Sequence, residues 1–225
     1  MIGRMVRRAL TRVAATAGGV AVICLVASAA TVSNFSFETP ALSSGWENNP
    51  TEAGTIWAFT GFAGIAHQGS PWFAGSPPDG SQAAWLQYNG LTTPGTMSQV
   101  LADLIPNDNY QFTFWAVRRD ASRYGNFDVL LGGNTILSVS VDPDSSSWVQ
   151  YTTNSMAATS SSMTLEFQML DFRPAPGYDA AVAIDLVEVH DLSESAPEPV
   201  SAALLGLGIA AVMTLRRRNR AANAD

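Results

Sequence analysis

Short runs of apolar or alternating residues recur between residues 31 and 191, and Gly, Pro, Asn, Asp and Ser separate them. The clearest alternation, over residues 110–117, would set four side chains on one face of a strand: Tyr110, Phe112, Phe114 and Ala116. Six further runs predict strands: Gln82–Tyr88, Thr96–Leu101, Asn126–Leu131, Trp148–Thr152, Met163–Met169 and Ala181–His190. We find no helical periodicity here, so the pattern predicts an all-β, antiparallel sandwich or barrel.

Two stretches interrupt this pattern of strands. Residues 48–80 are rich in Gly, Pro and aromatic residues, which predicts long loops. Residues 153–162 read TNSMAATSSS and predict a polar connection. We expect residues 30–192 to form one β-sandwich ectodomain, since the chain is long enough for a single core.

Residues 1–29 have the pattern of a cleavable secretory signal peptide. Four Arg residues precede residue 13, a short apolar run follows, and Ala27-Ser28-Ala29 ends the segment. Basic residues, an apolar stretch and small residues in this order are what signal peptidase recognises. The apolar run is short for a spanning helix, which needs about 20 residues. The pattern therefore predicts export.

Charge and cysteine content narrow the function. Residues 30–199 carry four Arg, no Lys and 18 Asp and Glu, a formal charge of −14. Such an acidic body repels phosphate backbones, so we expect no nucleic-acid partner. The one cysteine, Cys24, lies inside the signal peptide. The processed protein would then hold no disulfide and no thiolate site.

The C-terminal segment has three parts in order. Residues 193–199 form an acidic, Pro-containing spacer, residues 200–215 an apolar run that predicts a transmembrane helix, and residues 216–225 a basic cytoplasmic tail. The residues that carry this signal are Pro197, Glu198, Pro199, Arg216, Arg217 and Arg218. Together they resemble the PEP-CTERM sorting signal of exosortase substrates. The resemblance implies membrane anchoring, then processing by an exosortase, and a final place in the cell envelope, at the cell surface or outside the cell.

A second resemblance covers most of residues 32–191. The opening segment 34–40 (NFSFETP) and the closing segment 183–189 (AIDLVEV) are similar to those of galactose-binding-like jelly rolls, which include many carbohydrate-binding modules. The resemblance implies a β-sandwich whose first and last strands pair. It also implies one structural calcium ion between Glu38 and Asp185. The alternative is that these are two separate, solvated residues at strand ends.

Aromatic side chains are the natural candidates for stacking on sugars. Trp85, Trp115 and Trp148 fall within predicted strands, and we expect them in the core. Four loop residues are better candidates for a ligand site: Trp72, Phe73, Tyr124 and Tyr178.

The sequence offers no recognisable catalytic motif, since neither histidine accompanies a nucleophile pattern and no carboxylate pair stands out. We therefore expect a protein without enzymatic activity that binds polysaccharide or associates with an exopolysaccharide matrix. A structural or adhesive subunit without a defined glycan ligand is one alternative. A glycan hydrolase with an unrecognised carboxylate pair is another.

Overall fold

The computed structural model describes residues 30–52, 54–88, 93–119, 125–141, 147–170 and 180–193. Every regular element in these ranges is a β-strand, and every pairing is antiparallel. None of these residues belongs to a helix that could cross a membrane. The signal peptide, the proposed transmembrane helix and the basic tail lie outside the described ranges.

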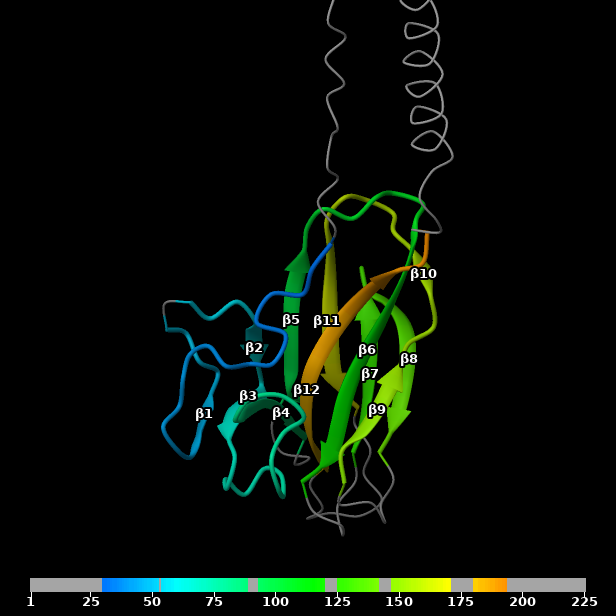
Figure 1. Ribbon diagram of the computed structural model, residues 1–225. Helices are drawn as coiled ribbons and strands as arrows, with labels where there is room; N and C mark the ends of the chain where they lie inside the picture. The colour runs from blue at the N-terminus through cyan, green and yellow to red at the C-terminus, as the bar shows by residue number, and fades with distance from the viewer. Residues whose placement is uncertain are drawn as a thin grey trace, which may run out of the picture.

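The strands form two sheets that pack face to face, which confirms the predicted antiparallel sandwich (Figure 1). The seven-stranded sheet contains, in spatial order, β1 (Trp46–Asn48), β3 (Phe62–His67), β4 (Gln82–Tyr88), β12 (Ala180–Asp191), β6 (Asn109–Arg118) and β10 (Met156–Ala157), with β9 (Val149–Thr152) also paired to β6. The five-stranded sheet contains β2 (Ala58–Thr60), β5 (Thr96–Leu101), β11 (Met163–Met169), β7 (Asn126–Leu131) and β8 (Asn134–Ser140).

The main core lies between the two sheets. The four alternating side chains of β6 that the sequence assigned to one face are all buried there: Tyr110, Phe112, Phe114 and Ala116. Aromatic rings from both sheets meet in this core, and the centroids of Phe114 and Phe167 are 5.1 Å apart with their planes perpendicular. Edge-to-face pairs of this kind add about 0.5–1.5 kcal/mol to the burial of the rings.

The segment before the first strand closes one side of the sandwich. The backbone N–H of Val187 donates to the carbonyl of Phe35, and the side-chain amide of Gln99 bonds both backbone groups of Ser33 at 2.8 Å. The segment is not a strand, so the predicted pairing of first and last strands is reduced to one bond. The first and last described residues lie at the same end of the sandwich (Figure 1).

Residues 48–80, which the sequence assigned to loops, contain two strands, β2 and β3. Strand β3 is buried in its four central residues because both of its faces are covered. A strand covered on both faces lacks the alternation that identifies a half-exposed strand. β8, and the two-residue β10 within the predicted polar connection, were missed as well.

Candidate functional site

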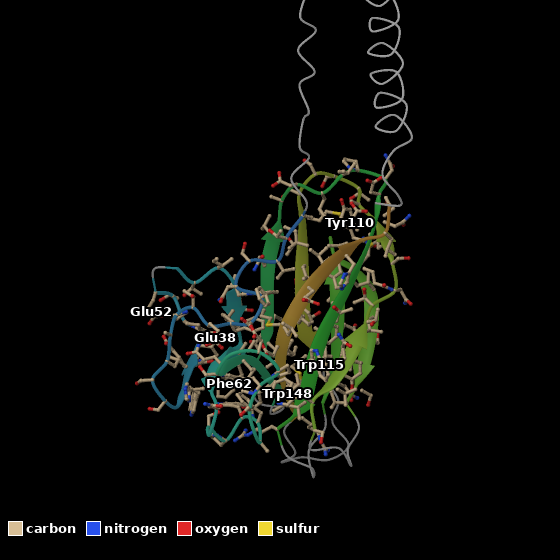
Figure 2. All side chains as sticks on the ribbon, in the orientation of Figure 1. Glu38, Glu52, Phe62, Tyr110, Trp115 and Trp148 are labelled. Carbon is tan, nitrogen blue, oxygen red and sulfur yellow. The ribbon has the colours of Figure 1, made fainter. Side chains whose placement is uncertain are left out.

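The outer face of the seven-stranded sheet, which points away from the five-stranded sheet, has a covered part and an open part. The loop of residues 68–81, between β3 and β4, covers the outer side of β4 and of the first half of β12. The outer side of β6 before Val117, of β9 and of the second half of β12 is half-buried or exposed. In Figure 2, Trp115 lies on β6 at the boundary between the two parts, with Trp148 beside it.

Two of the predicted sugar-stacking residues belong to the covering loop. Trp72 and Phe73 are each only 3% exposed. Trp72 stacks on Trp85 with ring centroids 3.7 Å apart, and Phe73 contacts the ring of Trp148. Small side chains beneath these rings leave room for them: Ala66, Ala83, Ala181 and Ala183. Both predicted stacking rings are therefore used inside the protein, as a second core on the outer face.

The remaining predicted site residues of this kind fall outside the described part of the chain. They are Tyr124 and Tyr178, together with the sorting residues Pro197, Glu198, Pro199, Arg216, Arg217 and Arg218. Of the three tryptophans expected in the core, Trp85 is fully buried, whereas Trp115 and Trp148 are half-buried.

The covered part ends at an exposed tryptophan on the edge strand β1. Trp46 is 47% exposed and meets Trp72 and Trp85 edge to face, with centroids 5.8 and 5.7 Å away. The guanidinium of Arg119 lies 4.4 Å from the centroid of the Trp72 ring. These contacts fix the orientation of the Trp46 ring.

The open part is a patch that we term the outer polar face. Its members alternate with the core residues of their strands and share one side of the sheet through direct cross-strand pairing. They are Gln111, Thr113 and Trp115 of β6, Gln150 of β9, and Glu188 and His190 of β12. An indole ring among amide, hydroxyl, carboxylate and imidazole groups offers both a stacking surface and hydrogen-bonding groups.

Three members of the outer polar face form a hydrogen-bonded row. The hydroxyl of Thr113 donates to Oε2 of Glu188 at 3.3 Å, and the hydroxyl oxygen of Thr113 lies 2.9 Å from Nε2 of His190. A hydroxyl has one proton, so Thr113 accepts from the imidazole when it donates to the carboxylate. The row fixes the directions of Glu188 and His190, both of which are exposed.

A β-bulge in β12 creates this arrangement. The pairing of β12 with β6 shifts between Asp185 and Glu188, and Leu186 adopts a left-handed conformation with φ 51°. The extra residue returns Val187 to the core and turns Glu188 outward. Strict alternation would have turned Glu188 inward, so the bulge decides which residues line the face.

The two predicted calcium ligands meet at one end of the covering loop. Glu38 accepts hydrogen bonds from the backbone N–H groups of Ser81 and Gln82, both at 2.8 Å, and from the Ser81 hydroxyl at 3.1 Å. Oδ2 of Asp185 accepts from the backbone N–H of Asp79 at 2.9 Å. The reading of two separate, solvated residues is therefore wrong, because both carboxylates bind the same four-residue stretch.

Asp185 is unusual for a carboxylate because it is fully buried. Burial raises its pKa to about 7, and the neighbouring charges of Asp79 and Glu38 raise it too, while hydrogen bonds from the backbone of Asp79 and Leu186 oppose the change. Its second oxygen, Oδ1, is buried without a hydrogen-bond partner. We term Glu38, Asp79 and Asp185 the carboxylate cluster.

The carboxylate cluster has some of the properties of a calcium site. An orphaned buried oxygen and mutual repulsion among carboxylates both fit a divalent cation, and calcium takes further ligands from backbone carbonyls. However, no group of three or more His, Cys, Asp or Glu side chains in the described ranges is arranged to hold a metal. A metal here would thus depend on backbone oxygens for part of its coordination.

An open cavity of about 240 Å³ adjoins the outer polar face. It lies between the opening segment and the second half of β12, and its walls include Phe35, Val187, Glu188 and Val189. Phe35 is 41% exposed. The cavity therefore offers an apolar wall next to the Glu188 carboxylate.

Fold and site together define an antiparallel β-sandwich with an open, aromatic and polar sheet face. The chain belongs to the HpiC1-like family, described as HpiC1 cyclase, whose model matches residues 28–189. This membership contradicts the expectation of a protein without enzymatic activity, because the family is one of cyclases. The expectation rested on known catalytic motifs, and a cyclase need not carry any of them. A search of curated protein sequences finds no match.

Several solved structures share features of this fold. The Stig cyclase Fisc from Fischerella sp. TAU, in complex with an indole ligand, is 15% identical over 70% of this chain and 94% of its own, with a TM-score of 0.49. TmCBM61 in complex with β-1,4-galactotriose is 14% identical over 71% of this chain and 97% of its own, with a TM-score of 0.47. The carbohydrate-binding module CBM36, in complex with calcium and xylotriose, is 12% identical over 52% of this chain and 87% of its own, with a TM-score of 0.38. Similarity at this level carries no argument about function.

Proposed function

We propose that this protein binds a polysaccharide on the outer polar face, with Trp115 as the stacking ring. The observation that carries the proposal is a half-buried indole at the border of an open sheet face whose other members supply amide, hydroxyl and carboxylate groups. Sugar rings present apolar CH surfaces and peripheral hydroxyl groups, and this combination of side chains complements both.

The geometry suits a ligand that lies along the strands. Thr113 and Trp115 are two residues apart on one face of β6, which separates them by roughly 7 Å. Gln150 lies directly opposite Trp115 on β9, and Glu188 directly opposite Thr113 on β12. A sugar stacked on Trp115 would therefore reach hydrogen-bonding groups on both neighbouring strands.

The test is retention of the full chain on a panel of immobilised polysaccharides. We expect Trp115→Ala to weaken retention by roughly 5- to 150-fold, since stacking on an aromatic ring is worth about 1–3 kcal/mol. Gln150→Ala should weaken retention less, because this exposed side chain offers a hydrogen bond but no stacking surface. Val100→Ser, on the outer face of the other sheet, is the control that should not change retention.

Two outcomes would count against this site. Retention of wild type on no member of a broad panel would refute polysaccharide binding. Retention lost in Trp46→Ala but kept in Trp115→Ala would move the site to the edge strand, where Trp46 is the more exposed ring. Circular dichroism of each variant separates loss of binding from loss of fold.

We also propose that one calcium ion binds at the carboxylate cluster and fixes the covering loop. Glu38 and Asp185 would be its carboxylate ligands, and the orphaned Oδ1 of Asp185 is the feature that supports it most. The loop it would fix covers the sheet up to Trp115, so calcium would also stabilise one border of the outer polar face. The ion has a structural role here and takes no part in a reaction.

Metal analysis and thermal melts of the full chain test this second point. We expect about one calcium per chain and a Tm that falls on chelation, with the chelation effect absent in Glu38→Gln. An unchanged Tm and no bound metal would refute the calcium ion. Polysaccharide retention can persist in that case, so the two proposals fail separately.

Cyclase activity is the second candidate function, and family membership is the observation that favours it. The indole that accompanies Fisc in its solved structure provides a defined probe. Isothermal titration of this compound into the full chain should give saturable heat if the chain has kept a related pocket. Absence of heat for the compound, with polysaccharide retention intact, would favour the glycan reading.

For localisation, we infer export by the segment of residues 1–29 and sorting to the cell envelope by the C-terminal signal. The support is the order of the parts in the sequence, from Pro197-Glu198-Pro199 to the Arg cluster. Replacement of these three residues by alanine should retain the chain in the membrane fraction in a host with an exosortase. Equal release of the variant and the wild type would refute sorting by this motif.

A further inference from the structure

Glu188 gives the outer polar face a charge in a defined position. Its carboxylate is exposed, and its direction is fixed by the hydroxyl of Thr113, which in turn bonds His190. Thr113 lies two residues from Trp115 on the same face of β6. A carboxylate therefore lies about one sugar unit from the stacking ring.

The surroundings favour a cation at this position. The face of an indole attracts ammonium groups, with a strength of about 0.5–2 kcal/mol that grows as water is excluded. Residues 30–199 carry a formal charge of −14, which draws a polycation from solution and repels a polyanion. Arg119, a cation beside the covered part, is engaged with the Trp72 ring and with the carbonyl of Pro71.

We propose that the ligand is a polysaccharide with free amino groups, a polymer of hexosamine units, whose ammonium pairs with Glu188 while a sugar ring stacks on Trp115. This inference rests on the proposed polysaccharide binding and adds the substrate class. Neutral polymers would bind through stacking alone. Polymers of uronic acids are excluded, because their carboxylates would face Glu188 within an acidic protein.

The experiment compares two ligands that differ in charge but not in ring structure. Binding of the full chain to a deacetylated glucosamine oligosaccharide is measured beside binding to its fully N-acetylated form, at slightly acidic pH and low salt. A hydrogen bond to a charged group is worth about 1.5–3 kcal/mol, so we expect about tenfold tighter binding or more for the free amine. Polygalacturonate serves as the anionic polymer and should not bind.

Glu188→Gln is the decisive variant because it keeps the acceptor for Thr113 and removes the charge. It should abolish the preference for the amine, so that the variant binds the deacetylated and the N-acetylated forms about equally. Glu166→Gln is the matched control, since it removes the same charge from the outer side of β11 in the other sheet. This control should keep the preference, and its melting curve should match that of Glu188→Gln.

Each other result overturns the inference in an identifiable way. Equal binding of both oligosaccharides, weakened by Trp115→Ala, would refute the amine preference and leave polysaccharide binding intact. An equal loss in Glu166→Gln and Glu188→Gln would assign the preference to net charge rather than to this site. Absence of binding to every polymer would refute the proposed function, and the inference with it.

Discussion

Asp185 should make this domain less stable as the pH rises, whereas most carboxylates make a folded protein more stable as the pH rises. Its side chain is fully buried, and burial together with Glu38 and Asp79 raises its pKa from 3.8 to about 7. Between these two values the folded protein keeps a proton that the unfolded chain has released. The folded state binds more protons there, so the free energy of unfolding falls as the pH rises through this window.

The magnitude follows from the two pKa values of Asp185. Each pH unit between 3.8 and about 7 removes about 1.4 kcal/mol, which gives a total loss of about 4 kcal/mol. A typical domain has only about 5–15 kcal/mol of stability, so this loss is large. Below the window both states are protonated, and above it both are ionised, so the change is confined to it.

The assay is urea unfolding of the full chain with chelator present, monitored by tryptophan fluorescence from about pH 4.5 to pH 8.5. Other carboxylates contribute a background slope, so the readout is the difference between wild type and Asp185→Asn. This difference should grow by several kcal/mol in favour of the variant as the pH rises. Asparagine is neutral at every pH, so the free energy of unfolding of the variant lacks the contribution from the titration of Asp185.

Parallel curves for wild type and Asp185→Asn would refute the reasoning, because burial of this carboxylate would then have no consequence. Addition of calcium provides a second comparison. A bound cation favours the ionised carboxylate, so calcium should flatten or reverse the decline of the wild type alone. Identical wild-type curves in calcium and in chelator would refute calcium binding, but they would not contradict the predicted titration of Asp185.

Two further predictions concern the same loop and the main core. Gly80→Ala should cost about 2–3 kcal/mol in urea unfolding, because φ is +64° and a Cβ would lie 2.3 Å from Oε1 of Glu38. Gly75→Ala, at φ +77° with open space around it, should cost only about 1 kcal/mol, and equal losses would contradict the clash. Phe167→Ala should cost about 3–5 kcal/mol through the cavity it leaves, whereas Val100→Ala, 66% exposed, should change stability by less than about 0.5 kcal/mol.

Most strands of the sandwich were predictable from runs of apolar or alternating residues. β4, β5, β7 and β11 begin and end at the residues that the sequence indicated. β9 begins one residue later than predicted, and β6 and β12 each extend one residue further at both ends. β3 and β4 are both covered on their outer side and therefore both lack alternation. The seven-residue run of β4 was still recognisable as a strand, whereas the shorter β3 stands in a stretch rich in Gly, Pro and aromatic residues that predicted loops.

Part of the candidate site could be predicted in the same way. Alternation in β6 places Trp115 on the face opposite to Phe114, and this was the available signal that Trp115 is not a core residue. For Trp72 and Phe73 the error was the opposite one: the sequence predicted exposed ligand-binding rings, and the structure buries both. Loops are usually exposed, but these two rings fill the space above small side chains of strands distant in sequence.

The sequence by itself determined the fold class and the acidic charge of the body. Both depend on composition or on the local period of the chain. Only the tertiary structure decided that Glu38 and Asp185 bind one loop, that a bulge turns Glu188 outward, and that Trp115 is half-buried at the border of the outer polar face. Each of these depends on contacts between segments far apart in sequence, and the local pattern of a single chain does not encode such contacts.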